Sequence, residues 1–80
     1  GDHAGGWETS HLLASHPETV DLKAAANEMQ YGIMSTQNPL NATAQFGNEI
    51  YDAAVRKITE RVFLCLDNPE LYKGHGIPLI

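Results

Sequence analysis

The sequence predicts a mostly helical chain that forms one small domain at most, and one observation supports each part of this prediction. Apolar residues recur at i, i+4 steps through the second half of the chain, which is the spacing of one face of a helix. The chain has 80 residues, so it forms one small domain at most and buries roughly 60% of the surface that its unfolded form exposes. A chain of this size has little core with which to support an independent enzyme.

Two short helices are expected in the first part of the chain. The first covers residues 9–15, with its initial threonine or serine as N-cap, and it ends before Pro17 because proline disfavours helical geometry in the preceding residue. The second covers residues 21–30, and the side chain of Asp21 can cap it. Residues 31–41 lack a helical period and predict a connecting loop.

A long helix over residues 42–66 is the clearest element of the sequence. Asn41 or Thr43 can cap it. Its apolar stripe consists of Phe46, Ile50, Ala54, Ile58 and Val62. A helix of about 25 residues is roughly 37 Å long, whereas an 80-residue globule has a radius of gyration of about 12 to 13 Å. The stripe therefore requires a partner outside this chain, and residues 67–80 follow it as a turn and an extended tail.

The charge balance argues against nucleic acid as a partner. Ten acidic residues outnumber five basic ones, which gives a net charge of −5. The basic residues cluster once, at Arg56, Lys57 and Arg61, and Asp52 and Glu60 interrupt this cluster. A surface that follows phosphates needs clustered cations.

The cysteine content and the hydropathy pattern indicate a cytoplasmic protein. Cys65 is the single cysteine and lies in an apolar run, where a thiol behaves as a small hydrophobic side chain, so no intrachain disulfide can form. No apolar run approaches the roughly 20 residues that cross a bilayer, and no leader segment is recognisable. We therefore expect a reducing compartment and no membrane partner.

Reactive side chains are densest in the first eleven residues. Asp2, His3, Glu8 and His11 surround a pair of glycines and the single tryptophan, Trp7. Imidazole and carboxylate groups bind divalent metals and move protons near neutral pH. Glu8 and His11 are three residues apart, as in Glu-x-x-His metal-ligand pairs, although the stronger expectation for His11 is a residue at the surface or one that supports the ligands from behind.

Three segments resemble one enzyme family. They are Gly-Asp-His-Ala-Gly-Gly-Trp-Glu-Thr-Ser at residues 1–10, Leu-Leu-Ala-x-His-Pro-Glu-x-Val-Asp-Leu at residues 12–22, and Asn-Ala-Thr-Ala-Gln-Phe-Gly at residues 41–47. These segments resemble the later part of the creatininase (creatinine amidohydrolase) family, and together they span most of residues 2–66. The first motif is long and fairly specific.

The resemblance implies a fold and a chemistry. It implies an α/β class, in which residues 1–80 form the C-terminal part of a three-layer α/β/α domain of a metal-dependent hydrolase. Such an enzyme opens cyclic amides or related rings, contains divalent metal (zinc, manganese or iron), and is often a homo-oligomer. On the family pattern His3 is the catalytic histidine that exchanges a proton with the substrate, and Glu8 is the acidic residue at the metal centre. Trp7 would form an aromatic wall against a flat substrate.

The resemblance also sets limits. The family's earlier metal motifs lie outside these 80 residues, and a single ligand cannot form a metal site, so we expect a separate N-terminal chain to complete the enzyme. Two alternatives remain open. The same scaffold could act on a cyclic ketone or a sugar-derived ring, because the polarised carbonyl and the attacking water serve both reactions. Alternatively, the chain is a non-catalytic interaction or oligomerisation subunit that docks through its long amphipathic helix.

Overall fold

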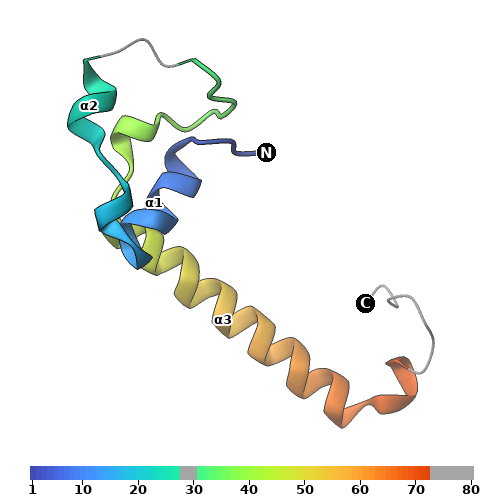
Figure 1. Ribbon diagram of the computed structural model, residues 1–80. Helices are drawn as coiled ribbons and strands as arrows, with labels where there is room; N and C mark the ends of the chain where they lie inside the picture. Colours follow the sequence, from blue (N-terminus) through green and yellow to red (C-terminus); the bar gives the residue numbers. More distant parts are fainter. Residues whose placement is uncertain (28–30, 73–80) are drawn as a thin grey trace.

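The computed structural model describes residues 1–27 and 31–72, and the described chain is largely helical (Figure 1). Its α-helices are α1 (Gly6–Ser15), α2 (Leu22–Ala26) and α3 (Ala44–Asp67). Its short 3₁₀ turns are η1 (Pro17–Thr19), η2 (Pro39–Asn41) and η3 (Pro69–Tyr72). An isolated antiparallel bridge between His3 and Met34 is the one β-type pairing among these residues. The α/β class concerns the completed domain and stays a prediction.

Helix α1 begins three residues earlier than the predicted 9–15, because its first turn is capped from outside the helix. Its N-cap residue, Gly5, has no side chain that could accept a hydrogen bond. Asp2 accepts one from the amide of Glu8 instead, at 2.8 Å. The predicted end is confirmed, since α1 stops at Ser15 and Pro17 opens η1.

Helix α2 is shorter than the predicted 21–30. The predicted cap is confirmed, because Asp21 Oδ1 accepts a hydrogen bond from the amide of Ala24 at 3.0 Å. The helix ends at Ala26, and the rest of the predicted range includes residues 28–30, which lie outside the described residues. The predicted loop over 31–41 contains η2 at its end, where Asn38 accepts a hydrogen bond from the amide of Leu40.

Helix α3 confirms the long element predicted over 42–66. Thr43, one of the two predicted caps, accepts a hydrogen bond from the amide of Phe46 at 3.0 Å, so the helix begins at Ala44. Its 24 residues extend for about 36 Å. The turn predicted after the helix is confirmed by η3, and residues 73–80 of the predicted extended tail lie outside the described residues.

Helices α1 and α3 cross in close contact at the N-terminal end of α3. The glycine at position 47 permits this approach, because a Cβ there would overlap the carbonyl oxygen of Ser10 and lie 2.8 Å from Cβ of Ala14. Ser10 is fully buried in the crossing, and its Oγ accepts a hydrogen bond from the amide of Thr43 at 3.1 Å. Two ring contacts also join the helices: Trp7 of α1 contacts Phe46 of α3, and His11 of α1 contacts Tyr51 of α3. This crossing fixes the orientation of α1.

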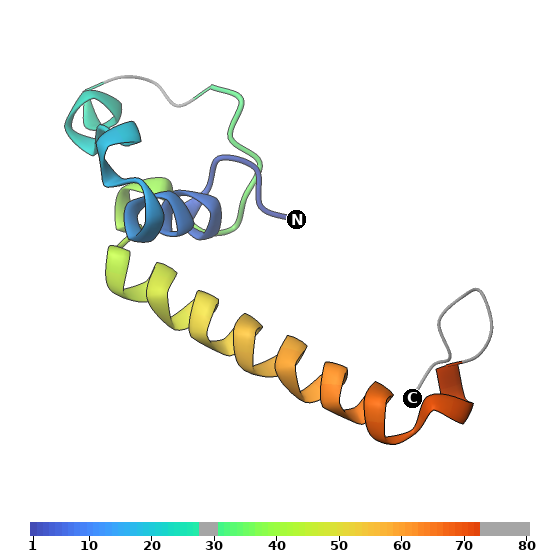
Figure 2. The same ribbon diagram turned by 60° about the horizontal axis from the view of Figure 1, so that its bottom comes forward.

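Beyond the crossing, α3 extends away from α1 and α2, and the described element that follows it is η3 at its C-terminal end (Figures 1 and 2). Val55, Ile58, Val62 and Leu66 are between 50% and 68% exposed. The radius of gyration is 17.5 Å, against about 12 Å for a compact chain of this length. The accessible surface is 6413 Å², whereas a folded monomer of this mass exposes about 4,800 Å². No helix in the described residues is long and apolar enough to cross a membrane.

Candidate functional site

The first residues of the chain and a distant loop form one hydrogen-bonded corner beside the N-terminus of α1. The backbone amide of His3 donates to the carbonyl oxygen of Met34 at 2.8 Å, and the amide of Met34 donates to the carbonyl oxygen of His3 at 3.0 Å. The amide of Gly6 donates to the carbonyl oxygen of Gln37 at 2.9 Å. Residues 3–6 are therefore held against residues 34–37, which are about thirty positions away in the sequence.

Asp2 joins both sides of this corner through its half-buried carboxylate. Oδ2 accepts a hydrogen bond from the amide of Glu8 at 2.8 Å, and Oδ1 accepts one from Oγ of Ser35. These hydrogen bonds stabilise the charged form, the one from Glu8 most and the one from Ser35 next. They outweigh the opposing effect of burial, so the pKa of Asp2 is lowered from its ordinary value of 3.8.

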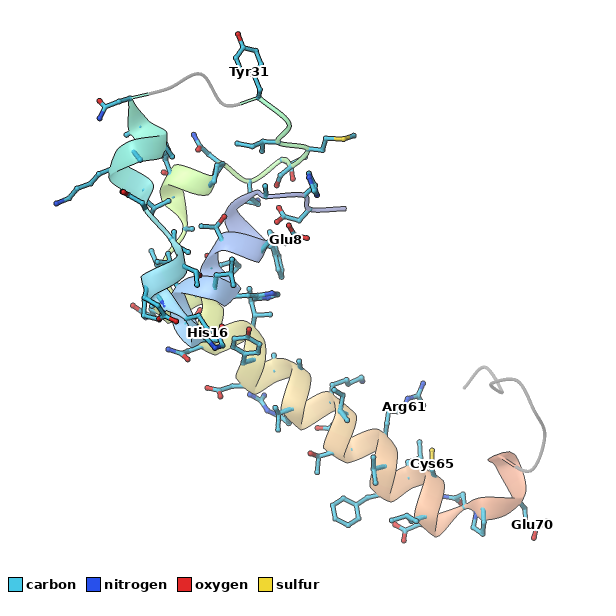
Figure 3. The ribbon with its side chains drawn as sticks, in the orientation of Figure 1. Glu8, His16, Tyr31, Arg61, Cys65 and Glu70 are labelled. Atoms are coloured by element: carbon cyan, nitrogen blue, oxygen red, sulfur yellow. The ribbon has the colours of Figure 1, made fainter. Side chains whose placement is uncertain are left out.

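Glu8 lies in the first turn of α1 and reaches back along the chain (Figure 3). Its Oε2 accepts a hydrogen bond from the amide of Ala4 at 2.7 Å. Ala4 has a φ of 53°, which is the left-handed region that residues other than glycine seldom adopt. Such backbone strain is concentrated at functional sites. The other carboxylate oxygen, Oε1, has no hydrogen-bond partner in the described part of the chain.

His3 has a fixed backbone and an exposed side chain. Its imidazole makes no hydrogen bond with any residue that the structure describes. Ala4, the residue directly after His3, links the backbone of His3 to Glu8, because the amide of Ala4 donates to the Glu8 carboxylate. The structure thus brings the backbone of one predicted site residue next to the side chain of the other.

Trp7 occupies a different position from these two residues. Its ring contacts Phe46 of α3 edge to face, with 5.1 Å between the ring centroids and an interplanar angle of 73°. Trp7 is still 43% exposed and borders an apolar hollow of about 430 Å³ between α1 and α3. The predicted aromatic wall therefore faces the groove between the helices, and no hydrogen bond in the described residues connects Trp7 to His3 or Glu8.

The expected Glu-x-x-His ligand pair is not formed. His11 is half-buried and turned towards α3, where its ring lies 5.2 Å from the ring of Tyr51. Its Nε2 is enclosed and has no hydrogen-bond partner. The crossing with α3 therefore covers part of His11, and of the two roles that the sequence favours, a surface position does not describe it.

Among the described residues of this corner, the carboxylate of Glu8 is the side chain that the sequence predicts as a metal ligand. Glu8 has a free carboxylate oxygen at the positive end of the α1 dipole, which favours the ionised form that binds a divalent ion. No group of three or more histidine, cysteine or acidic side chains among residues 1–27 and 31–72 could hold a metal ion. The described residues therefore show Glu8 with an oxygen available to a ligand, and they do not form a metal site by themselves.

Sequence reasoning missed the loop side of the corner. Ser35 and Gln37 lie in a segment without periodicity, and no local pattern connects them to Asp2. The available signal was Gly5, since a Cβ at this position would overlap the side chains of Ser35 and Asp2. A glycine in a motif can indicate that another segment approaches closely, but it does not identify that segment.

Comparison with known proteins gives no further assignment: no family model, no curated protein and no solved structure matches the chain.

Proposed function

We propose that this chain is the C-terminal part of a metal-dependent hydrolase of the creatininase type, which opens a cyclic amide or a related ring. The proposal begins from the motif at residues 1–10. The observation that carries it is the hydrogen bond from the amide of Ala4 to Glu8 Oε2, 2.7 Å long. It joins the residue after the proposed catalytic histidine to the proposed metal ligand, across a strained backbone turn at Ala4.

In the proposed reaction each residue of the corner has a separate task. Glu8 contributes a carboxylate oxygen to a divalent metal (zinc, manganese or iron), and its second oxygen remains on the backbone. The metal, when bound, supplies polarisation of the substrate carbonyl and acidifies the attacking water. His3 transfers a proton to the nitrogen or oxygen that leaves when the ring opens. Its exposed, unbonded imidazole is consistent with this task, because a ring already fixed by hydrogen bonds could not turn towards a substrate.

The bare half of α3 supports completion by a separate N-terminal chain. The accessible surface exceeds that of a compact monomer by about 1,600 Å², which is the area of a substantial interface on one chain. The bare face also includes Cys65, which is half-buried, and the side chains of Cys65 and Arg61 extend from the same side of α3 (Figure 3). In the proposed enzyme this face packs against the part of the α/β/α domain that contains the sheet and the other metal ligands.

The proposal is tested on the chain as it is purified with its partners. Intact-mass measurement identifies the completing chain, and elemental analysis measures zinc, manganese and iron. Hydrolysis is then followed with a panel of cyclic amides, creatinine included, alongside cyclic ketones and sugar-derived rings. We expect His3→Ala to lower kcat by about 10²- to 10⁴-fold, the usual contribution of a proton-transfer residue. His16→Ala, at an exposed position beyond the far end of α1, is the matched control.

A second candidate is an interaction subunit without chemistry of its own. The exposed apolar stripe on α3 favours it, because such a surface marks a protein-binding face regardless of catalysis. The two candidates differ in metal content. If the intact assembly contains no stoichiometric metal, or if it hydrolyses no ring, the hydrolase proposal fails and the interaction subunit is favoured. If His3→Ala hydrolyses rings as fast as the parent protein, His3 is not the proton-transfer residue.

A further inference from the structure

The corner at the N-terminus of α1 contains more residues than the reaction uses. Asp2 and Ser35 touch neither end of the proposed proton transfer, yet they hold the segments that carry His3 and Glu8. Ser35 Oγ donates to Asp2 and also accepts a hydrogen bond from the amide of Gln37 at 2.9 Å. One serine side chain therefore both shapes its own loop and binds it to the motif.

Two carboxylates brace the strained turn from opposite sides. Asp2 holds the backbone of Glu8 at 2.8 Å, and the side chain of Glu8 holds the backbone of Ala4 at 2.7 Å. His3 lies between Asp2 and Ala4, and its own amide and carbonyl are bound to Met34. The backbone of His3 is thus fixed directly and on both flanks, while its imidazole is left exposed.

We infer that Asp2 is a positioning residue of the hydrolase, and that it acts through Ser35 to hold His3 in register with Glu8. This inference rests on the proposed function. A displacement of about 1 Å in a reacting group can cost about 10²-fold in rate, so a clamp on the catalytic backbone acts on kcat and leaves substrate binding intact. Because Asp2 and Ser35 form one unit, losing either should have nearly the effect of losing both.

The test uses Asp2→Asn, Ser35→Ala and the double variant, in the chain as purified with its partners. Glu8 and Ser35 donate to different oxygens of Asp2, and asparagine replaces one of these oxygens with an NH₂ group that cannot accept. We expect each variant to lower kcat by about 10- to 100-fold with KM unchanged. We also expect amide hydrogen exchange at His3 and Met34 to become about tenfold faster. The double variant should match the single variants.

The controls are Ser15→Ala and Asp21→Asn. Ser15 donates to the carbonyl oxygen of His11 at 2.9 Å, so Ser15→Ala removes a similar hydrogen bond away from the corner. Asp21→Asn makes the same aspartate-to-asparagine change at the N-cap of α2, where asparagine can still accept the hydrogen bond. We expect both to keep the parent kcat and the parent exchange at His3.

The two readouts separate the inference from the proposed function. An unchanged kcat in an active enzyme, or losses that simply add in the double variant, overturn the inference. If the parent protein hydrolyses no ring, the proposed function fails. Hydrogen exchange alone then tests whether Asp2 and Ser35 hold the backbone of His3. Faster exchange at His3 and Met34 in the variants supports it, and unchanged exchange overturns it.

Discussion

Asp2 replaces a cap that the helix itself does not provide. Serine, threonine, aspartate or asparagine usually occupies the N-cap position and accepts a hydrogen bond from the third helical residue. In α1 that position is Gly5, which is buried against Ser35, and Asp2 supplies the acceptor from three residues further back. The carboxylate of Glu8 completes the reciprocal arrangement by accepting from the amide of Ala4.

The lowered pKa of Asp2 predicts a stability that depends on pH. A carboxyl group whose pKa is lower in the folded state stabilises that state at pH values above its unfolded pKa, here 3.8. This contribution is lost as the pH falls below 3.8 towards the folded-state pKa. Thermal denaturation measured between about pH 2 and pH 6 should show this loss in the parent protein and a smaller one in Asp2→Asn. Parallel curves for both proteins would contradict the assignment.

His11→Leu should stabilise the contact between α1 and α3. The enclosed Nε2 of His11 has no partner, and a buried polar group without a hydrogen bond costs about 1–3 kcal/mol. We expect leucine to raise the free energy of unfolding by about 1 kcal/mol, because part of the gain is offset by the lost ring contact with Tyr51. Chemical denaturation measures the change. His16→Leu, at an exposed position, serves as the control, and a destabilised His11→Leu protein would contradict the prediction.

At the scale of elements, one crossing connects the motif to the long helix. Ser10 links the two helices, since it is buried in α1 and accepts a hydrogen bond from the amide of the residue that caps α3. Glycine inside a helix ordinarily costs about 1 kcal/mol relative to alanine. At Gly47 this cost is offset by an approach between the helices that no larger residue permits.

Gly47→Ala should therefore destabilise the chain despite the better helix propensity of alanine. The new Cβ would overlap the Ser10 carbonyl, and this backbone atom cannot move aside as the tip of a flexible side chain could. We expect a loss of at least about 2 kcal/mol in the free energy of unfolding. Asn48→Ala, at the next and exposed position of α3, is the matched control. A Gly47→Ala protein as stable as its parent would show that the helices pack less closely than described.

At the scale of the whole molecule, the described chain is two unequal parts of one elongated body, 55 × 22 × 17 Å in extent. The N-terminal part includes the corner and the crossing, and the second part is the bare half of α3 (Figure 2). Among the described residues with apolar side chains, Pro39 and Ala42 are buried. Burial of the apolar stripe by another chain would supply the hydrophobic stabilisation that this chain lacks by itself.

Ile58→Glu should disrupt the predicted assembly. Ile58 is 63% exposed and lines an apolar hollow of about 370 Å³ with Val62, Cys65 and Leu66. A carboxylate there would lose its hydration when another chain packs on the apolar stripe of α3, which is unfavourable. We expect the completing chain to be lost, as measured by light scattering and intact mass. Thr59→Glu, one residue away and about 100° around the helix, should keep it. Retention of the partner by Ile58→Glu would place the interface elsewhere.

The sequence by itself determined the elements with local signals. The i, i+4 stripe predicted α3, Pro17 predicted the end of α1, and Asp21 and Thr43 were recognised as caps, because the forces involved act within a few residues. The early start of α1 could not be predicted in the same way. Its cap, Asp2, lies outside the helix, and the usual N-cap position is a glycine.

The tertiary structure alone decided which side chains of the motif meet. It placed Ser35 on Asp2, turned His11 into the crossing with α3, and gave Ala4 its left-handed backbone, and each outcome depends on contacts or hydrogen bonds formed when the chain folds. Patterns in a single sequence show the spacing of residues along the chain. They do not show which residues from distant segments come into contact. The sequence could therefore propose His3 and Glu8 as site residues from their types, whereas the hydrogen bonds that join their segment to a loop about thirty residues away depended on the tertiary structure.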